Sequence, residues 1–226
     1  MGQGGERRST QARDAELGAA VARAQDGDEA AFAVVYRIVQ PGLLGYVRGL
    51  VDQDAEDVAS EAWLEIARDL GRFKGDGAGF RGWSATIARH RALDQLRRRR
   101  SRPVIAPVDL HLVELPGPDS AHDQALEALS TERALELVRS LPSDQAEAVL
   151  LRVVVGLSGP AAARVLGKRP GAVRTAAHRG LKRLGRQLGA SDASDASDAS
   201  GSPDASGSSD ASDVTRNGAH TLRQSK

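Results

Sequence analysis

The segment SGPAAARVLGKRPGAVRTAAHRGLKRL, residues 158–184, decides the fold predicted for the C-terminal half of the chain. A short stretch of small and apolar residues ends at Gly167, the turn GKR follows, and a longer stretch begins at Pro170. Proline suits the first turn of a helix. A short helix, a tight turn and a longer helix form the helix-turn-helix layout, in which the second helix enters the major groove of DNA.

The second helix of this motif, residues 170–188, is predicted to be amphipathic. Its apolar residues recur about once per turn and are expected to face inward. They are Val173, Ala177, Leu181, Leu184 and Leu188. The outward face carries Arg174, Thr175, His178, Arg179, Lys182 and Arg183. A solvated basic helix is the alternative, but no acidic residue occurs between Ala161 and Leu188, which favours contact between this face and DNA.

The turn before this helix adds positions for contact with the DNA backbone. Lys168 and Arg169 lie at the turn and carry positive charge. Gly171 and Ala172 follow in the first turn of the helix, and their small side chains let backbone N–H groups approach phosphates.

The N-terminal half is predicted to be helical as well. Asp28 suits the N-cap of a helix that ends before Pro41, and Pro41 suits the first turn of a second helix. Apolar residues then recur every fourth position from Val58 to Leu70. After the loop KGDGAG, an apolar stripe is formed by Trp83, Ile87, His90, Leu93 and Leu96. No stretch alternates with period two, so the predicted fold class is all-α.

Composition divides the chain into five parts. Residues 1–16 are Gly-rich and polar, and we expect a disordered arm there. Two small helical domains are expected at residues 17–102 and 126–188, joined by a proline-containing flexible linker at residues 103–125. Residues 189–226 repeat Ser, Asp and Ala, which cannot bury a core, so a disordered tail is expected.

Charge is segregated along the chain, although the net charge is only +1. The segment from Gly71 to Arg102 holds ten basic and two acidic residues, among them the run Arg97–Arg100. A helix dipole favours cations at a C-terminus, but four consecutive arginines exceed what a cap requires, so we interpret the run as a phosphate-binding block. Two basic blocks separated by acidic ones indicate that a polyanion is bound at two places.

The acidic segment DAEDVASEAWLE, residues 54–65, has three interpretations. Its carboxylates are Asp54, Glu56, Asp57, Glu61 and Glu65. A face for a basic protein partner ranks first and a solvated helix surface second. A Mg²⁺ site for phosphoryl chemistry ranks a distant third, because no general base accompanies the carboxylates.

Several classes of function are excluded or disfavoured. The chain has no cysteine, so thiolate chemistry is excluded. The loop KGDGAG follows a predicted helix and lacks the GK[ST] ending of a nucleotide-binding loop. No catalytic constellation is found, so neither an enzyme, a metal site nor a cofactor is predicted. No apolar run approaches the ~18 residues that span a membrane, so we expect a soluble, intracellular protein without membrane insertion.

Two side chains near this loop have alternative roles. Phe80 and Trp83 could close the helix packing or stack on a base, and packing is favoured for Trp83 because it lies on the apolar stripe. His90 lies on the same stripe and is expected to be packed and hydrogen-bonded.

In order and spacing, these motifs resemble the extracytoplasmic-function (group 4) sigma factors of bacterial RNA polymerase. DAEDVASEAWLEI resembles the acidic helix of the family, and FRGWSATIARHRALDQLRRRR resembles its pattern F-x-x-W-L-x-x-I-A-R-N-x-x-x-D-x-x-R. LPSDQAEAVLLRVVVGLSGPAAARVLGKRPGAVRTAAHRGLKRL resembles the family's second domain with its helix-turn-helix. The resemblance covers residues 28–102 and 126–188 and implies two helical sigma domains, regions 2 and 4.

The resemblance also implies roles for individual residues. Contact with the clamp helices of the largest subunit of core RNA polymerase is implied for Asp54, Glu56, Asp57 and Glu61. Recognition and opening of the −10 promoter element are implied for Lys74, Gly75, Asp76, Phe80, Trp83, Arg89, His90, Arg97, Arg98, Arg99 and Arg100. Recognition of the −35 element is implied for Lys168, Arg169, Ala172, Arg174, Thr175, His178, Arg179 and Lys182.

The implied function is transcription initiation by a dissociable polymerase subunit, in the bacterial cytoplasm and with the nucleoid when active. An anti-sigma factor is a further implied partner. Departures from the family pattern are Ser60 for Gln, Ser84 for Leu, His90 for Asn and Arg169 for the Ser cap. A stand-alone helix-turn-helix regulator and a Mg²⁺-dependent nuclease or recombinase are the rival interpretations.

Overall fold

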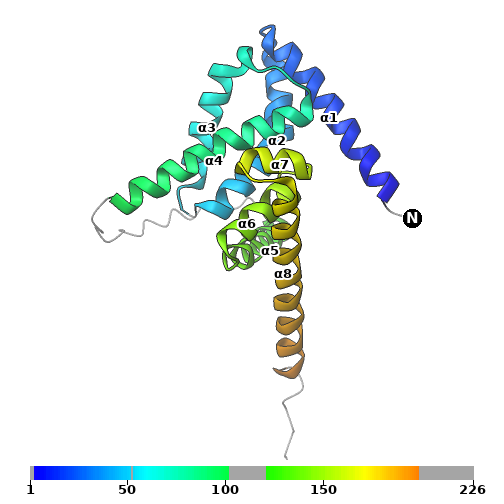
Figure 1. Ribbon diagram of the computed structural model, residues 1–226, viewed down its shortest axis with the longest axis vertical. Coiled ribbons are helices and arrows are strands. Elements are labelled where there is room, and N and C mark those ends of the chain that lie inside the picture. Colours follow the sequence, from blue (N-terminus) through cyan, green and yellow to red (C-terminus); the bar gives the residue numbers. More distant parts are fainter. Residues whose placement is uncertain (1–2, 52, 102–120, 199–226) are drawn as a thin grey trace, which may run out of the picture. The chain divides into compact units, whose positions relative to one another are not determined.

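The computed structural model describes residues 3–51, 53–101 and 121–198, and over these ranges its regular structure is entirely helical (Figure 1), which confirms the predicted fold class. The first domain comprises α1 (Gln3–Gln25), α2 (Glu29–Leu50), α3 (Ala55–Asp69), the 3₁₀ turn η1 (Leu70–Arg72) and α4 (Gly77–Ser101). The second domain comprises α5 (Ala121–Arg139), α6 (Ser143–Val149), the wider π-type turn η2 (Leu150–Val154), α7 (Gly159–Leu166) and α8 (Pro170–Asp198).

Helix α1 begins much earlier than the sequence suggests. The structure has helix from Gln3 onward, where residues 1–16 were expected to form a disordered arm. Leu17, Ala20 and Val21 are buried in the core of the first domain and hold the second half of the helix in place. Upstream of this anchor, Asp14 pairs with Arg81 of α4, so tertiary contacts stabilise a segment whose own composition favours loose chain.

Helix α2 is continuous through Pro41, so the division into two helices expected at this residue is wrong. Proline inside a helix costs about 3 kcal/mol. The buried residues Val35, Val39, Leu43 and Val47 form one face on both sides of the proline, and burying each aliphatic side chain contributes about 1.5–3 kcal/mol. The packing of one continuous face therefore exceeds the cost of the proline.

The same helix is long and apolar enough to cross a membrane by length and composition, a property that the count of uninterrupted apolar residues missed. Arg37 and Arg48 interrupt its sequence. Asp28 caps its start by accepting a hydrogen bond from the backbone N–H of Ala31 at 2.9 Å, as predicted. Its apolar face is buried in the first domain, which is the arrangement of a core helix.

Helix α4 buries mostly small residues, together with Phe80 and Ile87. Ser84, Ala85, Ala88 and Ala92 are fully buried, whereas His90 is exposed, so the prediction of a packed His90 is wrong. Small residues let the backbone of α4 approach its neighbours closely, and the centre of the buried face is displaced from the stripe of large apolar residues. The side chain of His90 therefore points away from the core.

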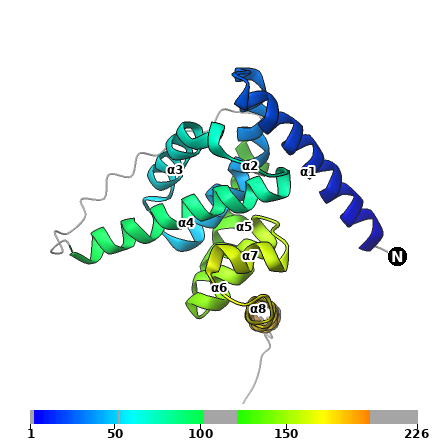
Figure 2. The ribbon, with the colours of Figure 1, turned by 45° about the horizontal axis from the view of Figure 1, so that its top comes forward.

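The helix-turn-helix forms as predicted, with α7 and α8 separated by Gly167 to Arg169. Ser158 caps α7 by accepting from Ala161 N–H at 3.3 Å, and Gly167 takes a left-handed conformation with φ 62°. Figure 2 shows α8 almost end-on beside α6. Its inward face is formed by Val173, Ala177 and Gly180.

Two leucines of α8 differ from the expected inward stripe. Leu181 is 48% exposed and Leu188 is 50% exposed. They line an open apolar groove of about 600 Å³ together with residues of α5 and η2, including Val153 and Val154. The stripe is therefore apolar but only partly covered, and in the described part of the chain the groove has no occupant.

The crossing of α1 and α4 gives a test of the first domain. A Cβ on Gly77 would lie 2.0 Å from the backbone oxygen of Asp14. We expect Gly77→Ala to lower the free energy of unfolding by about 2 kcal/mol, because a backbone clash requires one helix to shift. Urea denaturation followed by circular dichroism measures this. Gly82→Ala on the same helix is the control, since its Cβ meets nothing within 4 Å, and equal stability of the two variants would contradict the crossing.

Candidate nucleic-acid interface

The outward face of the helix-turn-helix is fully available to a ligand. All eight residues that the resemblance assigns to the −35 element are exposed: Lys168, Arg169, Ala172, Arg174, Thr175, His178, Arg179 and Lys182. Within the described ranges, none of the cations among them forms an ion pair. The hydroxyl of Thr175 donates to the Gly171 carbonyl at 3.0 Å. This face therefore carries concentrated positive charge that no carboxylate of the described part of the chain neutralises.

The carboxylates of α3 are placed differently, because most of them already bind arginines of this chain. Asp54 accepts hydrogen bonds from Gln95 and pairs with Arg99, and the Arg99 guanidinium holds the pKa of Asp54 below its usual range. Glu56 pairs with Arg48, which lowers the pKa of Glu56 in the same way.

Two further ion pairs join α3 to α4. Glu61 lies 3.4 Å from Arg98, and Glu65 pairs with Arg91. Asp57 is exposed and has no ion pair within the described residues. Of the four acids assigned to polymerase contact, Asp57 alone has an uncompensated charge in the part of the chain that the structure describes.

The arginine block at the end of α4 is consequently less cationic than its sequence suggests. Arg97 pairs with Asp94 at 2.8 Å, Arg98 with Glu61 and Arg99 with Asp54, while Arg100 is exposed. These pairs are largely solvent-exposed, and pairs of this kind contribute about 0–1 kcal/mol each. A phosphate can therefore displace the carboxylates at small cost.

The loop before α4 is shorter than predicted. Asp76 accepts a hydrogen bond from Gly79 N–H at 2.7 Å and so begins the helix at Gly77, whereas the loop was expected to reach residue 79. Lys74, Gly75 and Asp76 remain exposed. Asp76 thus has a structural role at the helix start in addition to the role that the resemblance implies.

Three aromatic rings close the packing behind this loop. Phe73 lies 5.2 Å from Phe80 and 5.2 Å from Trp83, measured between ring centroids. Phe80 is fully buried, so its ring packs in the core and does not face solvent. Trp83 is only half-buried: it packs against the core of the first domain as predicted, and it also lines a surface pocket.

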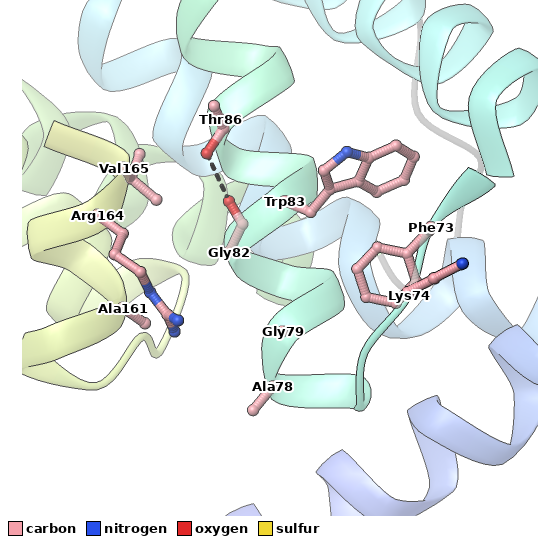
Figure 3. Close-up of a pocket in the computed structure, with 10 residues that line it drawn as sticks. All are labelled: Phe73, Lys74, Ala78, Gly79, Gly82, Trp83, Thr86, Ala161, Arg164 and Val165. Atoms are coloured by element: carbon pink, nitrogen blue, oxygen red, sulfur yellow. Dashed lines mark hydrogen bonds between the residues drawn. The ribbon is translucent and has the colours of Figure 1, made fainter. Parts of the chain in front are cut away.

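A pocket of about 280 Å³ opens beside Trp83 (Figure 3). Lys74, Gly79 and Gly82 line one side of it, and Arg164 of α7 lines the other. The structure thus brings Lys74 and Trp83 to one place. Arg89 and His90, which the resemblance assigns to the same element, lie elsewhere: His90 is exposed on α4, and Arg89 binds Glu147 of α6 at 2.7 Å.

Two features of these surfaces were missed in the sequence. Leu64 on α3 is 73% exposed and lies next in sequence to Trp63, whose ring packs in a tilted arrangement against the half-exposed Tyr36, with 4.7 Å between the ring centroids. Arg164 reaches the pocket beside Trp83 although it is distant in sequence. Leu64 could have been found, because it falls outside the fourth-residue repeat of α3; Arg164 could not, because its position depends on tertiary packing.

Among the residues whose placement is described, no group of three or more His, Asp or Glu could hold a metal ion. Asp54, Glu56, Glu61 and Glu65 pair with arginines, and Asp57 forms no ion pair in the described part of the chain.

Comparison with known protein families finds two matches. Sigma-70 region 2 matches residues 35–102, and sigma-70 region 4 matches residues 124–184. The first match contains α3, α4 and the loop between them, and the second contains the helix-turn-helix.

Individual relatives agree with these matches. The ECF RNA polymerase sigma factor SigD of Mycobacterium tuberculosis is 38% identical over 175 residues, which cover 74% of this chain and 82% of SigD. BldN of Streptomyces coelicolor, also an ECF sigma factor, is 36% identical over 173 residues, covering 74% of this chain and 64% of BldN. In fold, the chain is similar to RpoE of Bartonella quintana, solved with the anti-sigma factor NepR, with TM-score 0.52 and 23% identity over 70% of this chain and 96% of RpoE. The chain therefore belongs to the extracytoplasmic-function sigma factors of the sigma-70 family.

Proposed function

We propose that this sigma factor binds core RNA polymerase through α3, contacts the −10 promoter element with α4 and the loop before it, and reads the −35 element with α8. The observation that carries the proposal is the outward face of α8, where Arg174, His178 and Arg179 are exposed and have no carboxylate partner among the described residues. A helix in the major groove requires this arrangement, because base edges and phosphates must replace water around the cations.

Weak DNA contacts by the two domains are sufficient for promoter binding when polymerase holds both domains on one promoter. Each phosphate contact weakens as salt concentration rises, so α8 alone would bind DNA poorly at cellular salt. Linking the two contacts through polymerase raises the effective concentration of the second one. The proposal therefore expects weak promoter binding by the free protein and strong binding by the holoenzyme.

The polymerase-binding face is proposed to centre on the outer side of α3. Asp57 contributes an uncompensated negative charge there, and Leu64 contributes an exposed apolar side chain about two turns further along. A charged rim around an apolar anchor is the usual composition of a specific protein interface. The ion-paired Glu56 and Glu61 would support this face without carrying most of its binding energy.

The −10 contact is proposed to use Lys74, Trp83 and the arginine block at the end of α4. Aromatic side chains bind unpaired bases by stacking, which contributes about 1–3 kcal/mol per base. The exposed arginines then hold the phosphates of the same strand, after exchange of their carboxylate partners.

The proposal assigns no catalytic reaction to the chain and places it in the bacterial cytoplasm, with the nucleoid when it is active. An anti-sigma factor is proposed as a further partner. The open apolar groove between α5, η2 and α8 offers an exposed apolar surface for a second protein.

Run-off transcription with core polymerase, with and without this protein, on the DNA upstream of its own coding sequence tests the proposal. Initiation that depends on the protein supports a sigma factor. Repression of a promoter by the protein alone would instead support a stand-alone regulator, and cleavage of the template would support an enzyme.

Charge reversal of Asp57 tests the polymerase face. We expect Asp57→Lys to weaken binding to core polymerase about tenfold, because a repulsive charge replaces an attractive one in the interface. The fold should be unaffected, since the side chain is exposed. Fluorescence anisotropy of labelled protein titrated with core polymerase measures the dissociation constant. Asp26→Lys, an equally exposed reversal between α1 and α2, should bind like the wild type; if both reversals weaken binding equally, the face is not specific.

Truncation of Arg174 tests the reading of the −35 element. Losing a base contact costs about 1–3 kcal/mol of discrimination. We therefore expect Arg174→Ala to lower holoenzyme transcription at least about fivefold on the preferred −35 sequence while flattening the preference across a library randomised in that element. Arg186→Ala, exposed on the same helix three turns further, is the matched control and should keep the wild-type preference. An unchanged preference in Arg174→Ala would remove this residue from the reading surface.

A further inference from the structure

The exposed aliphatic side chains of the described residues gather in one place. Six large apolar side chains are exposed there, and four of them line the groove between α5, η2 and α8. These four are Val153, Val154, Leu181 and Leu188. Single exposed apolar residues need no explanation, but several that meet in one hollow mark an interaction site.

The groove has the size of a small-molecule site. Its volume is about 600 Å³, within the range of about 300–1,000 Å³ that is usual for ligand pockets. Leu181, Leu184 and Leu188 follow one side of α8, and the rise of the helix puts the first and last of them about 10 Å apart. Val138 of α5 and Leu150 of η2 are buried and contribute to the lining. The groove therefore suits one elongated ligand.

The composition of the walls restricts the chemistry of that ligand. Among the described residues that line the groove, none is aromatic and none is acidic. A planar ring system would find no ring to stack on, and a cationic ligand would find no carboxylate. A flexible aliphatic chain, in contrast, gains from every methylene that the leucines and valines remove from water.

The polar part of the lining comes from one turn of α5. Ser130, Thr131 and Arg133 are the only polar side chains that line the groove in the described part of the chain, and all three are exposed. The neighbouring Glu132 does not neutralise Arg133, because it pairs with Arg139 at 3.0 Å. Arg133 itself forms no ion pair within the described residues. One end of an aliphatic groove thus carries an available guanidinium and two hydroxyl groups.

We propose that this groove binds a fatty acid of medium or long chain length. The aliphatic chain lies along Leu181, Leu184 and Leu188, and the carboxylate binds the guanidinium of Arg133, which matches a carboxylate with two parallel hydrogen bonds. The hydroxyls of Ser130 and Thr131 add donors at the same end.

The proposed occupant is a free fatty acid and not a membrane surface. The four exposed side chains line a hollow, whereas insertion into a bilayer requires apolar side chains that project from a helix face. A bound fatty acid would cover the surface that a protein partner needs, so these two occupants exclude each other. The inference does not depend on the proposed promoter function, since it concerns binding by the free chain.

Isothermal titration calorimetry of the full chain with sodium dodecanoate tests the proposal. An acyl chain of similar length binds a membrane with an association constant of about 10⁴ M⁻¹, so we expect one site per chain with a dissociation constant of about 100 µM. Dodecyltrimethylammonium has the same chain with the opposite charge, and it should bind at least about fivefold more weakly because Arg133 repels it.

The possible results of this titration are distinct. Absence of saturable dodecanoate binding up to about 1 mM, ten times the expected dissociation constant, would overturn the proposal and leave the groove to a protein partner. Equal binding of the two amphiphiles would also overturn it, because Arg133 would then have no part in recognition. Failure of promoter-dependent transcription would leave the binding result unaffected.

Two pairs of variants locate the ligand. We expect Leu188→Gln to weaken dodecanoate binding at least about fivefold, because each buried methylene contributes up to about fourfold in affinity. Leu64→Gln on α3, which removes an exposed leucine outside the groove, should bind like the wild type. Arg133→Gln should abolish the preference for dodecanoate over dodecyltrimethylammonium, whereas Arg13→Gln on α1 should keep it. An unchanged preference in Arg133→Gln would remove the carboxylate from this end of the groove.

Sedimentation with phosphatidylglycerol vesicles separates the free ligand from a membrane. We expect the protein to remain in the supernatant. Co-sedimentation that Leu188→Gln abolishes, while Leu64→Gln retains it, would show that the groove binds a lipid surface and would overturn the proposal.

Discussion

Helix α2 is packed on two sides, and the arrangement of the described part of the chain depends on this constraint. One face, with Val35, Val39, Leu43 and Val47, lies in the core of the first domain. The other, with Tyr46 between glycines, lies against the second domain. Because α2 contributes residues to both apolar cores, two of its faces must be apolar. This explains why the helix is apolar and long enough to resemble a membrane-spanning segment.

Charge compensation differs between the two surfaces proposed to contact DNA. Arg91, Arg98 and Arg99 of α4 are paired with Glu65, Glu61 and Asp54, so a phosphate would have to displace these carboxylates. The cations of α8 have no such competitor within the described residues. In the proposed function, polymerase binding by α3 and DNA binding by α4 would therefore involve the same ion pairs. A basic polymerase surface that attracts Asp54 or Glu61 would release Arg99 or Arg98 for a phosphate, although each exposed pair contributes at most about 1 kcal/mol.

The fold class and the helix-turn-helix could be predicted because each depends on local patterns. Gly167, Pro170 and the spacing of Val173 and Ala177 specify the motif without reference to any other segment. Predictions were less successful where they depended on which face of a helix is covered by neighbouring helices. His90 was placed inside because it lies among large apolar residues, but α4 packs through its alanines.

The candidate sites also differ in whether a local pattern or a contact between distant segments determines them. The exposed row on α8 follows from helix periodicity, so sequence suffices to place it. The pairing of Arg89 with Glu147, and the approach of Arg164 to Trp83, join segments separated by more than fifty residues. No local pattern specifies contacts of this kind. The linker was predicted at residues 103–125: residues 103–120 lie outside the described residues, and residues 121–125 belong to α5. The tail beyond residue 198 also lies outside them, while residues 189–198, expected in the tail, continue α8.

The glycines of α2 show what the close approach of the second domain to this helix costs. In a helix interior each glycine costs about 1 kcal/mol relative to alanine, and Pro41 adds to that cost. A Cβ on Gly45 would lie 2.8 Å from a side-chain atom of Val154, and one on Gly49 would lie 2.5 Å from a side-chain atom of Leu150. The cost of these glycines is therefore offset where η2 lies against this face of α2.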